Sequence, residues 1–323
     1  MNNSSTIKRI TKNFKSELTM LAIFLVFFII MSFASPYFLT SRNILNIVSQ
    51  VSSNALLSIG MTIVILTGGI DLSVGGILGL SGMIGAIVIN SGDGHPVLGV
   101  IVMIAVALVC GAFNGFLVGY LRMPAFIVTL GTTNICRSLD YVISNNNTQS
   151  GFPEGYAFLG KHKVFAGIPV YVFFLILMFG IFIFVLSKTK FGRFIYASGS
   201  NLEAAELSGI NVRKIIMFCY MISGLMCALA AWIMTSRLMA CDPTYGNGAE
   251  MDAIAAAVIG GTSMSGGKGT LWGTVIGVML VGSLRNALNL LGVNPYWQGS
   301  ALGAVIILAV LAERISALRK GNK

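Results

Sequence analysis

Charge, histidine and cysteine are scarce in this sequence, and each shortage excludes a class of protein. Charged residues make up 10% of the 323 residues, whereas a soluble globular domain carries about 25%. His95 and His162 are the two histidines, and they lie far apart in polar stretches, which argues against a metal site. The five cysteines are odd in number and show no C-x-x-C spacing, so neither a disulfide framework nor a zinc site is indicated.

Groups for catalysis or ATP binding are also lacking. No set of serine, histidine and aspartate and no pair of carboxylates indicates a positioned acid, base or nucleophile. The segment SMSGGKGT, 263–270, resembles a phosphate-binding loop, but the pattern G-x-x-x-x-G-K-[ST] requires glycine at 262 and serine or threonine at 269. Those positions hold Thr262 and Gly269. We therefore predict a non-catalytic chain that itself binds no cofactor and no metal.

Long apolar stretches dominate the composition. Residues of the set AVILMFWYC make up 55% of the chain, and the mean hydropathy is +0.85. Since a membrane-spanning helix needs about 20 mostly apolar residues, we predict an all-α integral membrane protein with about ten transmembrane helices in a single transmembrane domain, 1–323. The stretches are 18–36, 48–67, 73–90, 97–120, 124–144, 166–187, 213–236, 250–261, 271–291 and 298–313. The eighth is short for a span.

Basic residues predict the orientation. The net charge is +10, and most lysines and arginines fall on the cytoplasmic side if the N-terminus is cytoplasmic. We therefore predict that both termini are cytoplasmic and that the number of spans is even. No basic stripe is interleaved with aromatic residues, so nucleic acid is not an expected partner. Two connections are long: a polar one at about 145–165, expected outside, and a cytoplasmic one at about 188–212.

The 188–212 connection encodes a short polar helix. Ser200 and Glu203 have the S-x-x-E spacing of a capping box, the following residues favour helix, and Gly209 suits the left-handed position that ends one. The helix is too short to span a membrane and is marginal on its own in water. We expect packing on a partner to hold it, and a helix that lies at the membrane surface without a partner is the alternative.

The same segment resembles a motif of a known family. Glu203, Ala204 and Ala205 followed by Gly209 are similar to the EAA motif of ABC importer permeases. Four further stretches resemble the ribose-type monosaccharide permeases: ILTGGIDLSVG (65–75), LSGINVRKI (207–215), DAIAAAVIGGTSMSGGKGT (252–270) and NALNLLGV (286–293). The resemblance covers residues 18 to 315, nearly the whole chain.

The resemblance implies a coupling helix in a cleft of an ATPase subunit. The residues that it assigns to coupling are Ser200, Leu202, Glu203, Ala204, Ala205, Glu206 and Gly209. Glu206 makes this helix more acidic, and we hypothesise that its carboxylate faces a basic residue of the ATPase. The other implied partners are ATP and Mg²⁺ on that ATPase, a periplasmic or lipid-anchored sugar-binding protein, membrane lipid, and a second permease subunit, expected to be a second copy. The implied location is the bacterial cytoplasmic membrane.

The segment LTGGIDLSVGG, 66–76, places a carboxylate among glycines between two apolar stretches. Its signature residues are Gly68, Gly69, Asp71, Ser73 and Gly75. We predict that Asp71 lies at the cytoplasmic junction and caps a helix that begins at Leu72. The alternative is a break deeper in the membrane, whose free backbone groups line the transport path. GGTSMSGGK at 260–268 is similar, which indicates either an internal repeat or chance similarity.

Polar side chains within the apolar stretches are candidates for the transport path. They are Gln50, Asn54, Asn114, Thr129 and Asn134, and hydrogen bonding between helices is the alternative role of each. We predict the permease subunit of an ATP-driven importer that carries a monosaccharide such as ribose, or a related sugar, by alternating access. An ATP-driven importer of a non-sugar solute and an ion-driven secondary transporter are the alternatives. The scarcity of ionisable residues within the stretches argues against the second.

Overall fold

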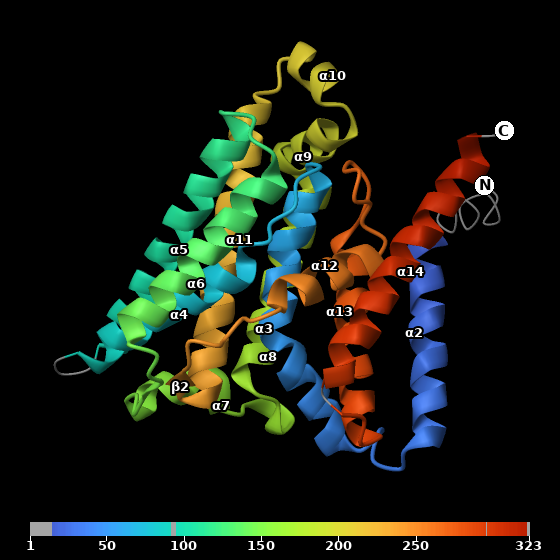
Figure 1. Ribbon diagram of the computed structural model, residues 1–323. Helices are drawn as coiled ribbons and strands as arrows, with labels where there is room; N and C mark the ends of the chain where they lie inside the picture. Colours follow the sequence, from blue (N-terminus) through green and yellow to red (C-terminus); the bar gives the residue numbers. More distant parts are fainter. Residues whose placement is uncertain (1–14, 92–94, 295, 322–323) are drawn as a thin grey trace.

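A computed structural model describes residues 15–91, 95–294 and 296–321, which form a bundle of helices (Figure 1). Each predicted apolar stretch corresponds to one helix, so the all-α membrane fold is confirmed. These helices are α2 (Lys15–Ala34), α3 (Ser41–Leu66), α4 (Val74–Asn90), α5 (Pro96–Gly119), α6 (Ala125–Ser144), α8 (Val170–Lys188), α11 (Val212–Leu238), α12 (Ala249–Ile259), α13 (Leu271–Leu290) and α14 (Tyr296–Gly321). In the described residues, α3, α5, α8, α11 and α13 are long and apolar enough to cross a membrane.

The eighth stretch forms a helix too short to span. Helix α12 has 11 residues, which at 1.5 Å per residue cover about 16 Å of a hydrocarbon layer about 30 Å thick. It runs within the bundle between the other helices (Figure 1). The apolar parts of α2 and α4 are also shorter than a full span. The predicted number of about ten therefore counts the apolar helices, and not all of these helices are long enough to cross the membrane fully.

The two long connections lie at opposite ends of the bundle. One contains α9 (Lys190–Ser200) and α10 (Leu202–Leu207), and α2 begins and α14 ends on this same side (Figure 1). The other contains β1 (Gln149–Ser150), α7 (Phe158–Lys161) and short 3₁₀ turns, and β1 pairs antiparallel with β2 (Ala240–Cys241). Sequence reasoning anticipated α10 but not α9.

A polar contact holds the β1–β2 end together. The hydroxyl of Thr148 donates to the carboxylate of Asp242 at 2.6 Å, and the backbone N–H of Thr244 donates to the same carboxylate at 2.9 Å. These hydrogen bonds lower the pKa of Asp242 below its usual value. The connection before α8 is thereby tied to the connection before α12.

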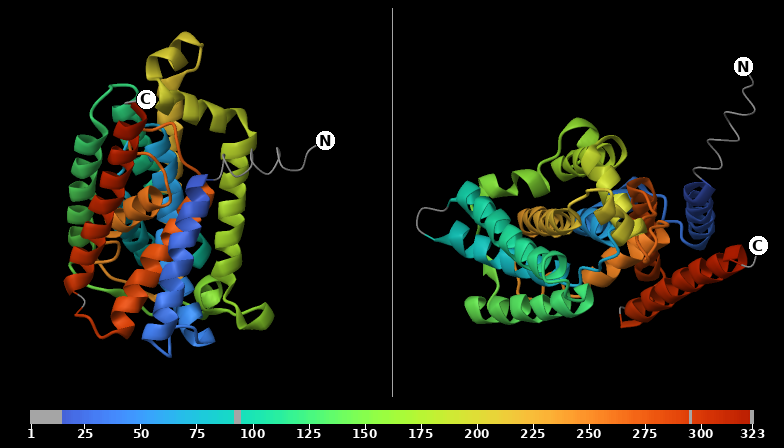
Figure 2. Two further views of the ribbon diagram at one scale, coloured as in Figure 1. Left: turned by 90° about the vertical axis from the view of Figure 1, so that its right-hand side faces the viewer. Right: turned by 90° about the horizontal axis from the view of Figure 1, so that it is seen from above.

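The centre of the bundle is formed by α3 and α11 (Figure 2). Helix α5 packs on α11 through glycines spaced four residues apart, Gly111, Gly115 and Gly119. A Cβ atom on Gly111 would lie 2.5 Å from the carbonyl oxygen of Tyr220 in α11. Small residues at this spacing let two helix backbones approach closely in a membrane.

Polar pairs connect α3 with α13. Asn43 and Asn286 exchange two side-chain hydrogen bonds, each of 2.9 Å, and the hydroxyls of Thr62 and Thr274 lie 2.8 Å apart. All four side chains are buried. Hydrogen bonds between membrane helices fix their register, because an unpaired polar group in an apolar layer is costly.

The glycine contact between α5 and α11 gives a first test. We expect Gly111→Ala to destabilise the protein by about 1–3 kcal/mol, because the new Cβ meets backbone that cannot move aside cheaply. The measurement is the thermal unfolding midpoint of the detergent-solubilised protein. Gly180→Ala in α8 is the matched control, since nothing lies within 4 Å of its Cβ position. Equal midpoints for the two variants would contradict the close packing.

Candidate coupling segment and transport path

The predicted short helix exists, but its cap is one residue later than expected. Helix α10 begins at Leu202, and the side chain of Asn201 accepts a hydrogen bond of 2.9 Å from the backbone N–H of Ala204. The capping box at Ser200 was wrong, because Ser200 still belongs to the last turn of α9 and the chain becomes extended only at Asn201. Gly209 is left-handed, with φ of +81°, and ends the helix as predicted.

Helix α10 projects from its end of the bundle (Figure 1). Leu202, Glu203 and Ala204 are exposed, and the side chain of Leu207 is 90% exposed. Ala205 alone among the predicted coupling residues is buried. A two-turn helix with an apolar side chain so open to its surroundings has the shape of a docking element rather than of a packed connector.

Glu206 has a partner within this chain. Its carboxylate accepts hydrogen bonds of 2.9 Å and 3.2 Å from one guanidinium nitrogen of Arg122, in the connection between α5 and α6. The hypothesis that Glu206 faces a basic residue of another protein therefore meets a competing contact inside the permease.

Helix α9 brings the two glycine-rich segments together. The backbone N–H of Gly267 donates to the carbonyl oxygen of Leu66 at 2.9 Å, and the hydroxyl of Tyr196 in α9 donates to the carbonyl oxygen of Gly269 at 2.9 Å. A Cβ atom on Gly199 would lie 1.9 Å from the same Leu66 oxygen. The segment that leads into α10 thus touches the break after α3 and the loop before α13 through backbone.

Asp71 lies in a break inside the bundle, not at a helix cap. Helix α4 begins at Val74, and the fully buried carboxylate of Asp71 accepts hydrogen bonds from the backbone N–H of Ser73 at 3.0 Å, the hydroxyl of Ser73 at 2.5 Å and the hydroxyl of Ser223 in α11 at 2.7 Å. The predicted cap was wrong because α4 begins two residues later than expected, with Ser73 at the N-cap position. The alternative position, a deeper break, is the one observed.

Hydroxyl groups satisfy the backbone of this break. The carbonyl oxygen of Ile70 accepts from Thr129 at 3.2 Å and from Tyr220 at 3.3 Å, and that of Leu72 accepts from Thr133 at 2.8 Å. Non-helical backbone at membrane depth requires such internal partners. These carbonyl groups are therefore bound within the bundle.

Glycines shape both sides of the break. Gly68 is left-handed, with φ of +84°, a conformation that costs other residues strain. A Cβ atom on Gly75 would lie 2.3 Å from the carbonyl oxygen of Gly246 and 2.4 Å from a carboxylate oxygen of Glu250. The signature residues thus permit one sharp turn and one close approach of α4 to the segment that leads into α12.

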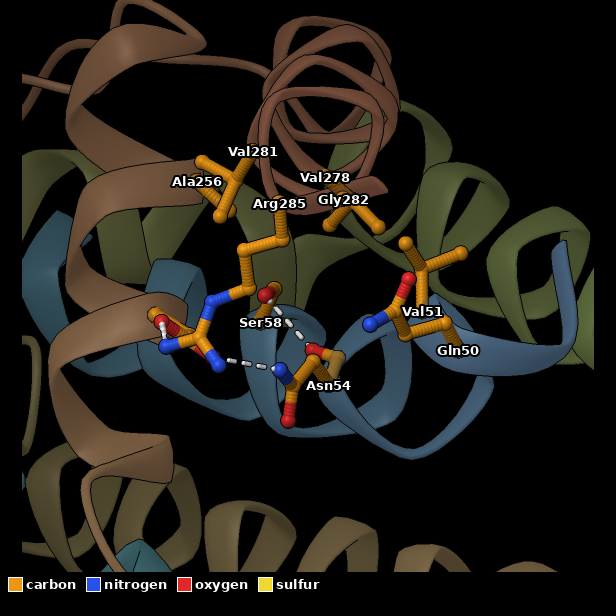
Figure 3. A pocket seen from close by; sticks show the side chains of 10 residues that line it. Gln50, Val51, Asn54, Ser58, Ala256, Val278, Val281, Gly282 and Arg285 are labelled. Atoms are coloured by element: carbon orange, nitrogen blue, oxygen red, sulfur yellow. Dashed lines mark hydrogen bonds and ion pairs between the residues drawn. The ribbon is translucent and has the colours of Figure 1, made fainter. Parts of the chain in front are cut away.

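The five candidate path residues separate into three groups. Asn114 and Thr129 are fully buried and belong to the break. Asn114 donates to the hydroxyl of Ser73 at 2.8 Å, and Thr129 donates to the carbonyl oxygen of Ile70. Asn134 is exposed on α6. Gln50 and Asn54 line one cavity of about 60 Å³ between α3, α12 and α13 (Figure 3).

An ion pair that sequence reasoning missed lines the same cavity. Arg285 of α13 donates to Asp252 of α12 at 2.6 Å, and Asn54 of α3 donates to the other carboxylate oxygen at 2.8 Å. Asp252 is 3% exposed, and the Nε atom of Arg285 is buried without a hydrogen-bond partner among the described residues. Opposite charges in neighbouring apolar stretches, 250–261 and 271–291, were the available signal.

Comparison with known proteins accounts for these features together. Residues 43–310 match the model of the permease component of branched-chain amino acid transport systems. The chain belongs to this permease family. The ribose import permease of Bacillus subtilis (strain 168) is 46% identical over 287 residues, which cover 88% of this chain and 89% of the relative.

Two relatives from Escherichia coli (strain K12) are similarly close to this permease. The ribose import permease is 41% identical over 306 residues, which cover 94% of this chain and 95% of the relative. The D-allose transport system permease is 41% identical over 284 residues, which cover 88% and 87%. The resemblance to ribose-type permeases is thereby confirmed. No solved structure matches the chain.

The permease carries no recognisable metal centre in the part of the chain that the structure describes. There, no three or more histidine, cysteine, aspartate and glutamate side chains are grouped so that they could hold a metal ion. All five cysteines are free. What the arrangement offers is a projecting helix at one end of the bundle and buried polar contacts around the break at 67–73 and around the short helix α12.

The cap of α10 can be tested locally. We expect Asn201→Ala to speed amide hydrogen exchange in 202–207 by about fivefold, because loss of an N-cap costs about 1 kcal/mol. Hydrogen–deuterium exchange read by mass spectrometry measures this. Ser200→Ala should leave the exchange in 202–207 unchanged. Faster exchange in Ser200→Ala and unchanged exchange in Asn201→Ala would instead support the capping box at Ser200.

The role of Asp71 can be tested by stability. We expect Asp71→Leu to lower the free energy of unfolding by about 2–5 kcal/mol, because the donors on Ser73 and Ser223 lose their acceptor while buried. Asp71→Asn should cost much less, since it keeps one acceptor oxygen and the hydroxyl of Ser223 can rotate to accept. Thermal unfolding in detergent distinguishes them. Equal losses would show that the break needs the charge itself.

Proposed function

We propose that this permease is the membrane subunit of an ATP-driven importer whose cargo is a monosaccharide, with ribose as the first candidate. The observation that carries this proposal is the identity of 41–46% over about nine-tenths of the chain to permeases named for ribose import. The permease named for D-allose transport supports the sugar class more broadly. The chain moves the sugar by alternating access, and a partner ATPase binds ATP and Mg²⁺.

Helix α10 is the proposed contact with the ATPase. Its exposed face, which includes Leu202, Glu203 and Leu207, enters a cleft of that subunit. The size, exposure and position of α10 at the end where α2 begins and α14 ends support this assignment. That end is proposed to be cytoplasmic, as the distribution of basic residues favours. A binding protein delivers the sugar at the β1–β2 end.

The transport path is proposed to form between two copies of the chain. The cavity beside Gln50 and Asn54 has a volume of about 60 Å³, well below the roughly 300–1,000 Å³ of typical small-molecule pockets. A monosaccharide is several times larger than one water, so this cavity does not pass it. A second copy supplies the other wall of the path, and Gln50, exposed at the cavity, remains a candidate to meet the sugar.

An uptake experiment tests the proposal. We expect cells to take up labelled ribose in a panel with arabinose, xylose, galactose and fructose, and to lose this uptake when either this permease or its ATPase is removed. Uptake that survives loss of the ATPase but stops when the ion gradient is collapsed would contradict ATP-driven import. Uptake of a different sugar alone would show that this sugar, not ribose, is the substrate. Uptake of no sugar in the panel would indicate a substrate that is not a sugar.

A further inference from the structure

The ion pair between Arg122 and Glu206 joins helix α10 to the connection between α5 and α6. Helix α10 packs on α9 and α11, whereas α6 begins at Ala125, beyond the α5–α6 connection. A hollow of about 300 Å³ lies beside the pair and is lined by Tyr120 from this connection, Glu206 from α10 and Arg213 from α11. Beside this hollow, the ion pair joins a side chain of α10 directly to a side chain of the α5–α6 connection.

The backbone at Arg122 is held in an unusual conformation. Its φ is +54°, in the left-handed region that is uncommon for residues other than glycine. Such conformations persist where the surroundings impose them, and they often mark functional positions. The connection is short, because α5 ends at Gly119 and Pro124 directly precedes α6. A displacement of Arg122 therefore reaches α6 within three residues.

Helix α6 in turn holds the break around Asp71. Its Thr129 and Thr133 donate hydrogen bonds to the carbonyl oxygens of Ile70 and Leu72. A shift of α6 at its first turn acts on this segment directly, because Thr129 lies one turn from Ala125. The contacts thus run without interruption from α10, through Arg122, to the broken helix in the bundle.

We propose that Arg122 is a positioning residue that ties the coupling helix to α6 and passes the ATP-driven movement of α10 to the break at 67–73. This inference rests on the proposed docking of α10 on an ATPase. The pair contributes little to folding, because its side chains are 59% and 36% exposed and pairs of this kind contribute about 0–1 kcal/mol. Its loss should therefore affect coupling while the fold persists.

Charge reversal of each partner tests the tie. The complete transporter is purified through a tag on this chain, reconstituted in vesicles and supplied with ATP and labelled D-ribose. We expect Arg122→Glu and Glu206→Arg each to raise the ATP hydrolysed per ribose moved by about fivefold, the factor that a change of about 1 kcal/mol gives. The double variant, which restores opposite charges, should return to within about twofold of the wild type.

A matched control and a second readout separate this tie from other roles. Lys214→Glu makes the same charge change beside the same hollow, and Lys214 is in no ion pair in the described part of the chain, so its ratio should not change. Spin labels on two exposed positions, Ser208 directly after α10 and Ile127 of α6, should report an ATP-driven distance change. That change should differ in the single variants and recover in the double variant.

The outcomes distinguish the proposals. Two results would show that Glu206 contacts the ATPase directly and would overturn the proposed role of the Arg122–Glu206 pair. One is a double variant that stays uncoupled. The other is loss of the ATPase from the purified complex in Glu206→Arg alone. Single variants that couple normally overturn it as well. A wild-type transporter that retains its ATPase but moves no ribose contradicts only the proposed substrate. The spin-label distances then test the role of the Arg122–Glu206 pair. Absence of any ATPase contradicts the proposed function itself.

Discussion

The need to bond every backbone group inside an apolar layer governs the arrangement around residues 67–73. A helix that stops within the bundle leaves carbonyl and N–H groups that lipid cannot satisfy. Here α6 and α11 supply hydroxyls to the carbonyl oxygens of Ile70 and Leu72, and Asp71 accepts the N–H of Ser73. Helix α5 joins through Asn114, which donates to the hydroxyl of Ser73. Three helices are thus fixed around one short break.

Close backbone contact then connects this break to the end of the bundle that carries α10. The carbonyl oxygen of Leu66 lies between Gly267, which donates to it, and Gly199, which has no side chain to displace it. Backbone that touches backbone has few rotamers through which to absorb a displacement, unlike contacts through long side chains. Helix α9 is thus in direct contact with the glycine-rich segments after α3 and before α13.

The sequence was sufficient for the helices and insufficient for their mutual contacts. Each apolar stretch became a helix because length and composition are local properties, and Gly209 ended α10 because its backbone preference is local too. The cap at Ser200 failed because it depended on where α9 ends, and α9 itself was not anticipated. Asn54 and Thr129 were equivalent as polar residues within apolar stretches, yet one lines a cavity and the other bonds the break. That distinction arises only from packing.

The short helix α12 and the break at 67–73 are each held through a buried carboxylate, Asp252 and Asp71, but with different partners. Helix α12 is fixed by the buried carboxylate of Asp252, which bonds both Arg285 in α13 and Asn54 in α3. The side chain of Arg285 is 34% exposed, but separating α12 from α13 would leave the buried carboxylate of Asp252 without its charged partner. The break at 67–73 depends largely on hydroxyls of serine, threonine and tyrosine, which rotate and can exchange one acceptor for another. Asp252 thus fixes α3, α12 and α13 to one another, whereas hydroxyl hydrogen bonds from Thr129 and Thr133 join α6 to the break.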